Sequence, residues 1–317
     1  MASVSPPAPA RFVITGPTGW IGSALLALLH RAGDPDALAE GESVALFGSR
    51  AGTIKVNQGP ELPVRALADL EADDVGGAHV IHLAYLTKDK LGDLSEDEFR
   101  RGNTAIDDAV IGASNESPPA SIFVASSGAA RQAETGRDKN AYGLTKLEQE
   151  ARFLEFGRSS GVPVLCGRIF NLAGPYINKL EDYAVSNFAV QALDGGRIRI
   201  EANQLVMRSF LHVEDLCRII LRAAREQVSE GGPIDLCGME VLEIQDIAER
   251  VATKIGRGIK IERPEISFAR LSDYVGQPVA TRALAAQLNV RLSGFDAQLA
   301  ETITWIRSMR AQSEAIT

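Results

Sequence analysis

Short apolar runs and segments with helical periodicity alternate along the first two-thirds of the chain. The apolar runs lack a polar face, which is typical of strands buried on both sides of a parallel sheet. Such strands are predicted at residues 11–15, 43–48, 62–66, 78–84, 121–126 and 163–169. Apolar residues recur with the period of an α-helix at 19–32, 95–115, 141–159 and 213–227. This alternation predicts an α/β fold with a doubly wound parallel sheet covered by helices on both faces.

A different rhythm begins after about residue 170. Loop-like and short-strand segments replace the regular alternation, and further helices are predicted near 243–255 and 294–310. We therefore expect a smaller C-terminal α/β lobe beside the larger domain. The expected larger domain is 1–173 with a return through about 205–238, and the expected lobe is 174–204 and 239–317.

Composition and charge exclude several classes of function. Hydrophobic residues make up 45% and charged residues 23% of the 317 residues, which allows a sizeable core and a soluble surface. The net charge of −8 repels phosphate polyanions, so we do not expect a nucleic-acid partner. The sequence shows neither a signal-peptide pattern nor an apolar run near the roughly 20 residues that span a bilayer. Sparse cysteines without a CxxC motif, and histidines without metal-ligand spacing, predict a cytoplasmic protein with free thiols and no metal.

Three glycines spaced three residues apart lie between the first predicted strand and the first predicted helix, in the segment TGPTGWIG at 15–22. Gly16 permits a sharp turn off the strand, and Gly19 lets the backbone come close to a pyrophosphate. Gly22 lets the helix pack closely on the sheet, and the helix N-terminus offers N–H groups to phosphate oxygens. The segment therefore predicts a dinucleotide site in a Rossmann-type domain.

The spacing GxxGxxG differs from the common GxGxxG fingerprint and resembles the TGxxGxxG of extended short-chain dehydrogenases/reductases. Within that group it resembles the nucleotide-sugar branch, the NAD-dependent epimerase/dehydratase family. Further motifs follow in the family's order: HLA at 82–84, YxxxK at 142–146, RxxNxxGP at 168–175 and RxFxHVxD at 208–215. The resemblance covers most of the chain. It implies a dinucleotide-binding larger domain, a substrate-binding lobe, a nucleotide-sugar substrate and a homodimer built on helices 95–115 and 141–159.

The catalytic residues implied by this resemblance are Ser127, Tyr142 and Lys146. Tyr142 and Lys146 are four residues apart and therefore share one face of a helix. A tyrosine near its reference pKa of about 10 is a poor base, and a nearby ammonium group favours the phenolate. Tyr142 would exchange a proton at a hydroxyl or carbonyl oxygen while hydride moves to or from nicotinamide, and Lys146 would hold the nicotinamide ribose. Ser127, chosen over Ser126 by motif register, would hydrogen-bond the same oxygen.

The end of the second predicted strand bears on the choice of cofactor. Enzymes that bind NAD commonly place an acid there, whereas this chain has Ser49 and Arg50. Because an arginine can pair with a 2′-phosphate, the pattern favours NADP(H), with NAD as the alternative. Asp69 resembles an acid that meets adenine and equally suits a plain turn. The expected cofactor-binding residues are Gly16, Thr18, Gly19, Trp20, Ile21, Gly22, Ser49, Arg50, Asp69, Leu70, Leu83, Ala84, Tyr142 and Lys146.

Dehydration, 4-epimerisation and carbonyl reduction are the three types of reaction that share this scaffold. Dehydratases of the family carry an Asp-Glu pair directly after the serine, where this chain has Gly128 and Ala129, so dehydration is disfavoured. We expect NADP(H)-dependent reduction of a keto group on a nucleotide-activated sugar of the 4-keto-6-deoxy type. A nucleotide-sugar 4-epimerase with tightly bound NAD and a reductase of a non-sugar carbonyl are the alternatives.

Four residues are expected to bind the substrate. Arg208 can pair with a diphosphate as a bidentate donor, although it also suits a surface strand. Asn171 can bind a phosphate or sugar oxygen, and the fifteen positions from Ser127 to Tyr142 leave a short loop with few further contacts. The expected substrate-binding residues are Ser127, Asn171, Asn187 and Arg208.

Overall fold

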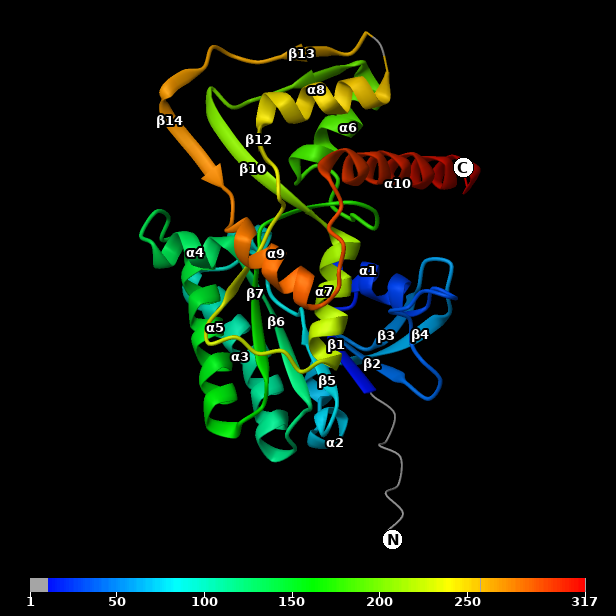
Figure 1. The fold of residues 1–317 in the computed structure, drawn as a ribbon, viewed down its shortest axis with the longest axis vertical. Coiled ribbons are helices and arrows are strands. Elements are labelled where there is room, and N and C mark those ends of the chain that lie inside the picture. Colours follow the sequence, from blue (N-terminus) through cyan, green and yellow to red (C-terminus); the bar gives the residue numbers. More distant parts are fainter. Residues whose placement is uncertain (1–10, 257, 317) are drawn as a thin grey trace. The chain divides into compact units, whose positions relative to one another are not determined.

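The computed structural model describes residues 11–256 and 258–316, which form two compact units. The first unit comprises Met1–Gly167 and Ile220–Pro233, and the second comprises Arg168–Ile219 and Ile234–Thr317. Each unit is described below by itself (Figure 1). The dinucleotide-binding role expected for the larger domain and the substrate-binding role expected for the lobe remain predictions.

A mostly parallel sheet dominates the fold. Within the described residues it has eight strands in the order β11-β7-β6-β5-β1-β2-β4-β3. Strands β1, β2, β4, β5 and β6 pair in parallel, and β3 adds an antiparallel hairpin edge to β4. The strands are β1 Arg11–Thr15, β2 Ser43–Gly48, β3 Gly52–Lys55, β4 Glu61–Ala66, β5 His79–His82, β6 Ser121–Ser127, β7 Val164–Ile169 and β11 Ile234–Leu236.

The order of these strands reverses at β1. The chain continues from β1 through β2 to one edge and then returns to β5 and β6 on the other side of β1. Ligands of open α/β sheets bind beyond the carboxyl ends of the strands at such a reversal. The predicted Rossmann-type α/β fold is confirmed, and its reversal places the glycine-rich segment at the expected binding edge.

The helices of the first unit begin and end at recognisable signals. Ser95 accepts a hydrogen bond from the backbone of Glu98 and starts α3, and Asn140 accepts one from Gly143 and starts α5. Helix α5 ends at Gly161, which has a φ of 76°. Helices α3 and α5 lie side by side (Figure 1). The helices are α1 Trp20–Leu29, α2 Ala72–Val75, α3 Glu96–Glu116, α4 Gly128–Glu134 and α5 Ala141–Ser160, with short 3₁₀ turns η1 Leu67–Asp69 and η2 Lys88–Gly92. Helix α7, Val213–Arg225, begins in the second unit and ends in the first.

A hydrophobic cluster fixes α5 against the sheet. Phe153 on α5 belongs to one hydrophobic cluster with Phe47, Val80 and Ile122 from three strands, and all four side chains are buried. Burial of apolar surface is worth about 25 cal/mol per Å², so this cluster is a main source of stability for the unit. It also fixes the height and rotation of α5, on which Tyr142 and Lys146 lie.

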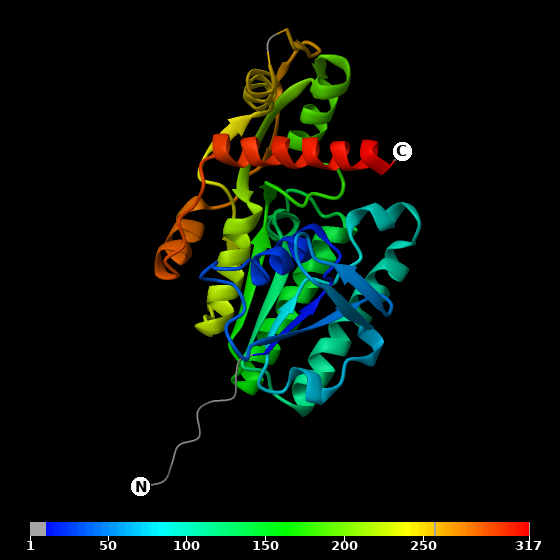
Figure 2. The ribbon, with the colours of Figure 1, turned by 90° about the vertical axis from the view of Figure 1, so that its right-hand side faces the viewer.

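In the described residues, the second unit is built from short strands, the start of α7 and four whole helices. Strand β10 is central to a small sheet of order β12-β10-β14, and β8 also pairs with β10. Helices α6, α8 and α10 share a core with β10, and α10 is a long single helix (red in Figure 2). Its elements are β8 Asn171–Ala173, α6 Ala184–Gly195, β9 Arg197–Arg199, β10 Gln204–His212, β12 Val241–Glu243, α8 Ile244–Ile255, β13 Lys260–Glu262, β14 Ser267–Tyr274, α9 Pro278–Gln287 and α10 Phe295–Ile316.

Candidate active site

The glycine-rich turn joins β1 to α1. Gly16 has a φ of 71°, and a Cβ placed on it would lie 2.8 Å from the backbone nitrogen of Ala84. A Cβ on Gly22 would lie 2.6 Å from the carbonyl oxygen of Pro17, whereas one on Gly19 would meet nothing closer than 3.6 Å. Gly19 is the N-cap residue of α1 and brings no side chain to the helix N-terminus. The turn is tightly packed inside and keeps bare backbone at the helix end, which fits a bound pyrophosphate.

The other residues predicted to bind the cofactor follow the turn or the ends of neighbouring strands. Ser49 and Arg50 come directly after β2, and Asp69 closes the η1 turn. The carbonyl oxygen of Asp69 accepts a hydrogen bond of 2.6 Å from Arg65. Thr18, Ser49, Arg50 and Asp69 are exposed, Trp20 is buried, and Ile21, Leu70, Leu83 and Ala84 are half-buried.

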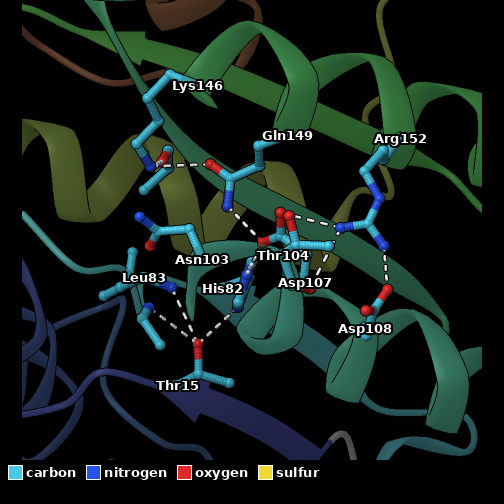
Figure 3. A network of polar contacts seen from close by, with 12 residues as sticks. Thr15, His82, Leu83, Asn103, Thr104, Asp107, Asp108, Lys146, Gln149 and Arg152 are labelled. Atoms are coloured by element: carbon cyan, nitrogen blue, oxygen red, sulfur yellow. Dashed lines mark hydrogen bonds and ion pairs between the residues drawn. The ribbon is translucent and has the colours of Figure 1, made fainter. Parts of the chain in front are cut away.

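Thr15 fixes the loop that follows β5 (Figure 3). Its Oγ1 accepts hydrogen bonds from the backbone nitrogens of Leu83 at 3.2 Å and Ala84 at 3.1 Å. The same oxygen lies 2.8 Å from Nδ1 of His82, so the hydroxyl proton is donated to that nitrogen. Nε2 of His82 then carries the ring proton and donates it to Asp107 at 3.1 Å. These bonds end β5 at His82, two residues earlier than the strand predicted over 78–84.

Ser127 and Tyr142 are brought together by β6 and the first turn of α5. Tyr142 hydrogen-bonds Ser127, and this bond lowers the pKa of the phenol while burial raises it more strongly, so the pKa lies above its ordinary value. Ser127 is the N-cap of α4 and accepts a hydrogen bond of 3.2 Å from Ala129. Ser126 instead donates to Glu150. Of the two adjacent serines, Ser127 is therefore the one that contacts the tyrosine.

Lys146 is buried beneath this pair, with 3% of its surface exposed. Its Nζ donates to the carbonyl oxygen of Ala125 at 2.7 Å and to Oε1 of Gln149 at 2.8 Å. The same Nζ lies 3.4 Å from the ring centroid of Tyr85, a cation–π contact. Burial lowers the pKa of Lys146 to about 7, against the raising effect of Asp107 and of other nearby groups. The expected lowering of the Tyr142 pKa is not what the structure shows, because Nζ is directed at Ala125, Gln149 and Tyr85.

An aromatic cluster surrounds the tyrosine. The rings of Tyr85 and Tyr142 meet edge to face with centroids 5.9 Å apart, and Phe99 lies 6.5 Å from Tyr142. Asn103 holds the Tyr85 loop, since its Oδ1 accepts from the backbone nitrogen of Leu86 at 2.8 Å. Tyr85 was not expected to belong to the site, although it directly follows the HLA motif.

Two further buried residues were also missed. Gln149 and Asp107 join Lys146 to the histidine of the HLA motif through hydrogen bonds (Figure 3). Gln149 is three residues after Lys146, and Asp107 is four residues after Asn103, so each lies on the same helix face as another residue of the site. That spacing was the available signal, but the contact itself depends on how α3 and α5 pack.

A cavity of about 540 Å³ lies within the second unit. Both Asn187 and Arg208 line it, together with Gln191 and Ser272. Nη1 of Arg208 donates to the carbonyl oxygen of Ser272 at 3.0 Å, and burial lowers the pKa of the guanidinium. Nε2 of Gln191 donates to Oδ1 of Asn187. The structure thus brings two of the predicted substrate-binding residues to one cavity.

Asn171 has a different environment. Its Nδ2 donates to the carbonyl oxygens of Ser209 at 3.0 Å and Tyr274 at 3.1 Å. Asn171 does not line the cavity that holds Asn187 and Arg208. Its amide therefore links β8 to the backbone of β10 and β14.

Across the part of the chain that the structure describes, no group of three or more His, Cys, Asp or Glu side chains is arranged to hold a metal ion. None of the helices in that part has the length and hydrophobicity needed to cross a bilayer.

Comparison with known proteins points to the family suggested by the motifs. A model of the NAD dependent epimerase/dehydratase family matches residues 12–237. UDP-glucuronic acid decarboxylase 3 of Arabidopsis thaliana is 28% identical over 127 residues, which cover 40% of this chain and 36% of that protein. The match therefore spans about a third of that relative's length.

Solved structures resemble the chain over nearly its whole length. The UDP-N-acetylglucosamine 4-epimerase of Methanobrevibacter ruminantium M1, in complex with UDP-N-acetylmuramic acid, has a TM-score of 0.75 and 17% identity and covers 95% of this chain and 99% of its own. The enzyme WbmF of Bordetella bronchiseptica, in complex with NADH, has a TM-score of 0.76 and 18% identity and covers 98% and 95%. At these identities the likeness shows the fold.

Proposed function

Because the chain belongs to the NAD-dependent epimerase/dehydratase family, we propose that it is a nucleotide-sugar oxidoreductase that uses Ser127, Tyr142 and Lys146. Its reaction would be reduction of a keto group on a nucleotide-activated sugar of the 4-keto-6-deoxy type. The observation that carries this proposal is the convergence of Tyr142, Ser127 and Lys146 in one unit with the glycine-rich turn.

The glycine-rich turn supports a dinucleotide as the cofactor. Gly16 and Gly22 pack where a side chain would meet backbone atoms, and Gly19 leaves the start of α1 bare. These residues would hold the pyrophosphate, and Lys146 would hold the nicotinamide ribose. When bound, a reduced nicotinamide supplies a hydride for the carbonyl carbon.

Tyr142 supports the reductive direction. Burial keeps the pKa of Tyr142 above its ordinary value, so the phenol carries its proton at neutral pH. In a reduction Tyr142 gives that proton to the carbonyl oxygen, and the Ser127 hydroxyl donates a hydrogen bond to the same oxygen. An epimerase must first remove a proton from a hydroxyl group, which suits a protonated phenol less well.

The residues that follow Ser127 bear on the alternative reactions. Gly128 and Ala129, both buried, begin α4 where dehydratases of the family carry an Asp-Glu pair. Dehydration through that pair is therefore unavailable to this chain. A 4-epimerase with tightly held NAD is the second candidate, since one structural neighbour is named as a 4-epimerase. Reduction of a non-sugar carbonyl is the third.

The cofactor preference rests on Arg50. This exposed residue follows β2, where a guanidinium can pair with a 2′-phosphate. We favour NADP(H) for this reason and keep NAD as the alternative, because one structural neighbour is in complex with NADH.

The second unit supplies the proposed contacts to the nucleotide sugar. Arg208 lines a cavity that also contains Asn187, and the guanidinium and amide groups can donate to diphosphate and sugar oxygens. Nδ2 of Asn171 is engaged by two backbone oxygens, so its proposed contact would be made by Oδ1, which can accept from a sugar hydroxyl group. We also retain the predicted homodimer on α3 and α5 and the cytoplasmic location as proposals.

Replacement of the proton donor tests the proposal. In Tyr142→Phe, we expect binding of reduced dinucleotide to survive while turnover of a 4-keto-6-deoxy nucleotide sugar falls by about 10²- to 10⁴-fold. Ser126→Ala is the matched control because Ser126 contacts Glu150 and not the tyrosine, and it should retain most activity. Turnover by Tyr142→Phe at the wild-type rate would show that the assigned proton donor is wrong.

A further inference from the structure

A buried amide links the site's lysine to a buried carboxylate. Gln149 accepts a hydrogen bond from Nζ of Lys146 at 2.8 Å through Oε1 and donates one to Oδ1 of Asp107 at 2.7 Å through Nε2 (Figure 3). Gln149 is 2% exposed and Asp107 is 3% exposed. An ammonium group can only donate and a carboxylate can only accept, so the two partners fix the orientation of the amide.

The surroundings of Asp107 are those of an anion. Its Oδ1 also accepts the Nε2–H of His82 at 3.1 Å, and its Oδ2 lies 3.6 Å from Nη1 of Arg152. The histidine is held in the donating tautomer by Thr15. Three donors from three different side chains therefore converge on one carboxylate, which a neutral acid could not satisfy as well.

We propose that Asp107 is the counter-ion of Lys146 and that Gln149 is the bridge that aims the ammonium group, so that both act as positioning residues of the active site. This inference deepens the proposed function and rests on it, because Lys146 is placed there as the residue that holds the nicotinamide ribose. Neither Asp107 nor Gln149 need touch the substrate or the cofactor to act in this way.

Several groups face Lys146 or Asp107, and those around Lys146 contribute differently to its pKa. Asp107 from α3 is the strongest of the groups that raise the pKa of Lys146, followed by Glu150 from α5 and Cys166 from β7. The uncharged ring of Tyr85, from the loop after β5, covers Nζ. Tyr142 lies one helical turn before Lys146 on α5, while His82 and Arg152 face Asp107.

This balance makes the charge of Lys146 sensitive to Asp107. Burial pulls the pKa of Lys146 down to about 7, so its charge changes within the neutral pH range. An opposite charge within reach of a buried group is worth roughly one to three pKa units. Removing the charge of Asp107 should therefore leave Lys146 largely as the neutral amine, unable to act as a cation.

Titration of Lys146 itself is the test. Lysine Cε resonances of isotope-labelled full-length protein are followed against pH, and the Lys146 signal is identified by its loss in Lys146→Arg. A buried lysine near 7 separates from exposed lysines near 10.4. Asp107→Asn should lower the Lys146 midpoint by at least about one unit. Asp108→Asn is the matched control, since Asp108 is the adjacent residue, 61% exposed, and pairs with Arg152 without bonding to Gln149.

Two variants of Gln149 should shift the Lys146 midpoint in opposite directions. They keep the test decisive if Asp107→Asn fails to fold. Gln149→Met removes the acceptor and should lower the midpoint, whereas Gln149→Glu places a carboxylate beside Nζ and should raise it. General loosening of the core cannot produce both results. An unchanged midpoint in the Asp107 and Gln149 variants, or an equal shift in Asp108→Asn, would overturn the proposal.

The same protein samples separate this inference from the proposed function. Wild-type protein is titrated with NADPH and NADH by fluorescence of the reduced nicotinamide. A shift of the Lys146 midpoint in a protein that binds neither dinucleotide would keep the counter-ion role and refute the proposed function. Dinucleotide binding without a midpoint shift would refute the counter-ion role and leave the proposed function standing.

Discussion

Alanine substitutions at two glycines of the turn between β1 and α1 are expected to affect different properties, namely stability at Gly22 and dinucleotide affinity at Gly19. A Cβ on Gly22 would lie 2.6 Å from the carbonyl oxygen of Pro17 and 2.7 Å from that of Gly16, where ordinary contacts begin near 3.4 Å. Overpacking of this kind costs about 1–3 kcal/mol, and both opposing atoms are backbone, so the upper half of that range applies. Alanine in a helix regains about 1 kcal/mol relative to glycine. Gly22→Ala should therefore destabilise the protein by about 1–2 kcal/mol.

Gly19→Ala should leave stability almost unchanged. Its Cβ would meet nothing closer than 3.6 Å, and its φ of −72° and ψ of 170° suit alanine. The new methyl group would instead stand at the start of α1, where we propose that the pyrophosphate binds. Loss of at least about tenfold in dinucleotide affinity, or 1.4 kcal/mol, is expected.

Thermal denaturation without ligand, followed by NADPH titration, measures both effects. Gly22→Ala should melt several degrees lower, since 1 kcal/mol corresponds to about 2–4 °C in proteins somewhat smaller than this one. Gly19→Ala should melt near the wild type and bind NADPH weakly. If Gly19→Ala bound NADPH as tightly as the wild type, the phosphate site would not be at this turn.

Three further predictions concern the cofactor, the pH and the cavity of the second unit. Arg50→Ala should weaken NADPH binding about tenfold and leave NADH binding nearly unchanged, as measured by fluorescence titration; equal losses for both would remove the argument for NADP(H). Because burial holds the pKa of Lys146 near 7, below its unfolded value of about 10.4, its ammonium form is lost as pH rises through 7. Dinucleotide affinity should then fall above pH 7 while this group's contribution to stability rises between about pH 7 and 10, and a flat affinity profile would argue against the ribose role. Arg208→Ala should raise the KM for the nucleotide sugar with little change in melting temperature, because Arg208 lines the cavity. Asn171→Ala should lower the melting temperature, because Asn171 bonds two strands. The reverse pattern would make Asn171 the substrate-binding residue and Arg208 the structural one.

The catalytic helix shows how much of the site the sequence could predict. The spacing of Tyr142 and Lys146 is local to one helix, and helix geometry alone places both side chains on one face. Alternation along a strand predicts that Ser126 and Ser127 point to opposite sides, and motif register selected Ser127. The glycine-rich turn followed from its place between a predicted strand and a predicted helix, and the reversal of strand order at β1 agrees with it.

The residues that sequence reasoning missed depend on packing between elements. Asp107 reaches Gln149 only because α3 and α5 lie side by side, and Tyr85 covers Lys146 only because Asn103 holds its loop. The Lys146 pKa could not be predicted either, since burial and not spacing sets it. The Nδ2 bonds of Asn171 to two neighbouring strands also depend on packing, and its expected contact with the substrate stays a prediction.

Strands and helices also differ in how well their local sequence patterns predicted them. Strands β1, β5, β6 and β7 were predicted well because their apolar runs are almost fully buried. The hairpin strand β3 and the strand β14 were not predicted, since most of β3 and half of β14 are exposed. Helix α4 was also missed, because its seven residues, three of them alanine, give no clear apolar stripe.

Titration of the purified wild-type protein with NADPH and NADH tests the central claim most directly. Nicotinamide fluorescence is followed during the titration, and any nucleotide released on denaturation is identified. We expect saturable binding of both dinucleotides, tighter for NADPH, to a protein purified without nucleotide. Copurified, tightly held NAD with little affinity for NADPH would contradict the Arg50 argument and make the 4-epimerase the leading function. Binding of neither dinucleotide would contradict the account of the site as a whole.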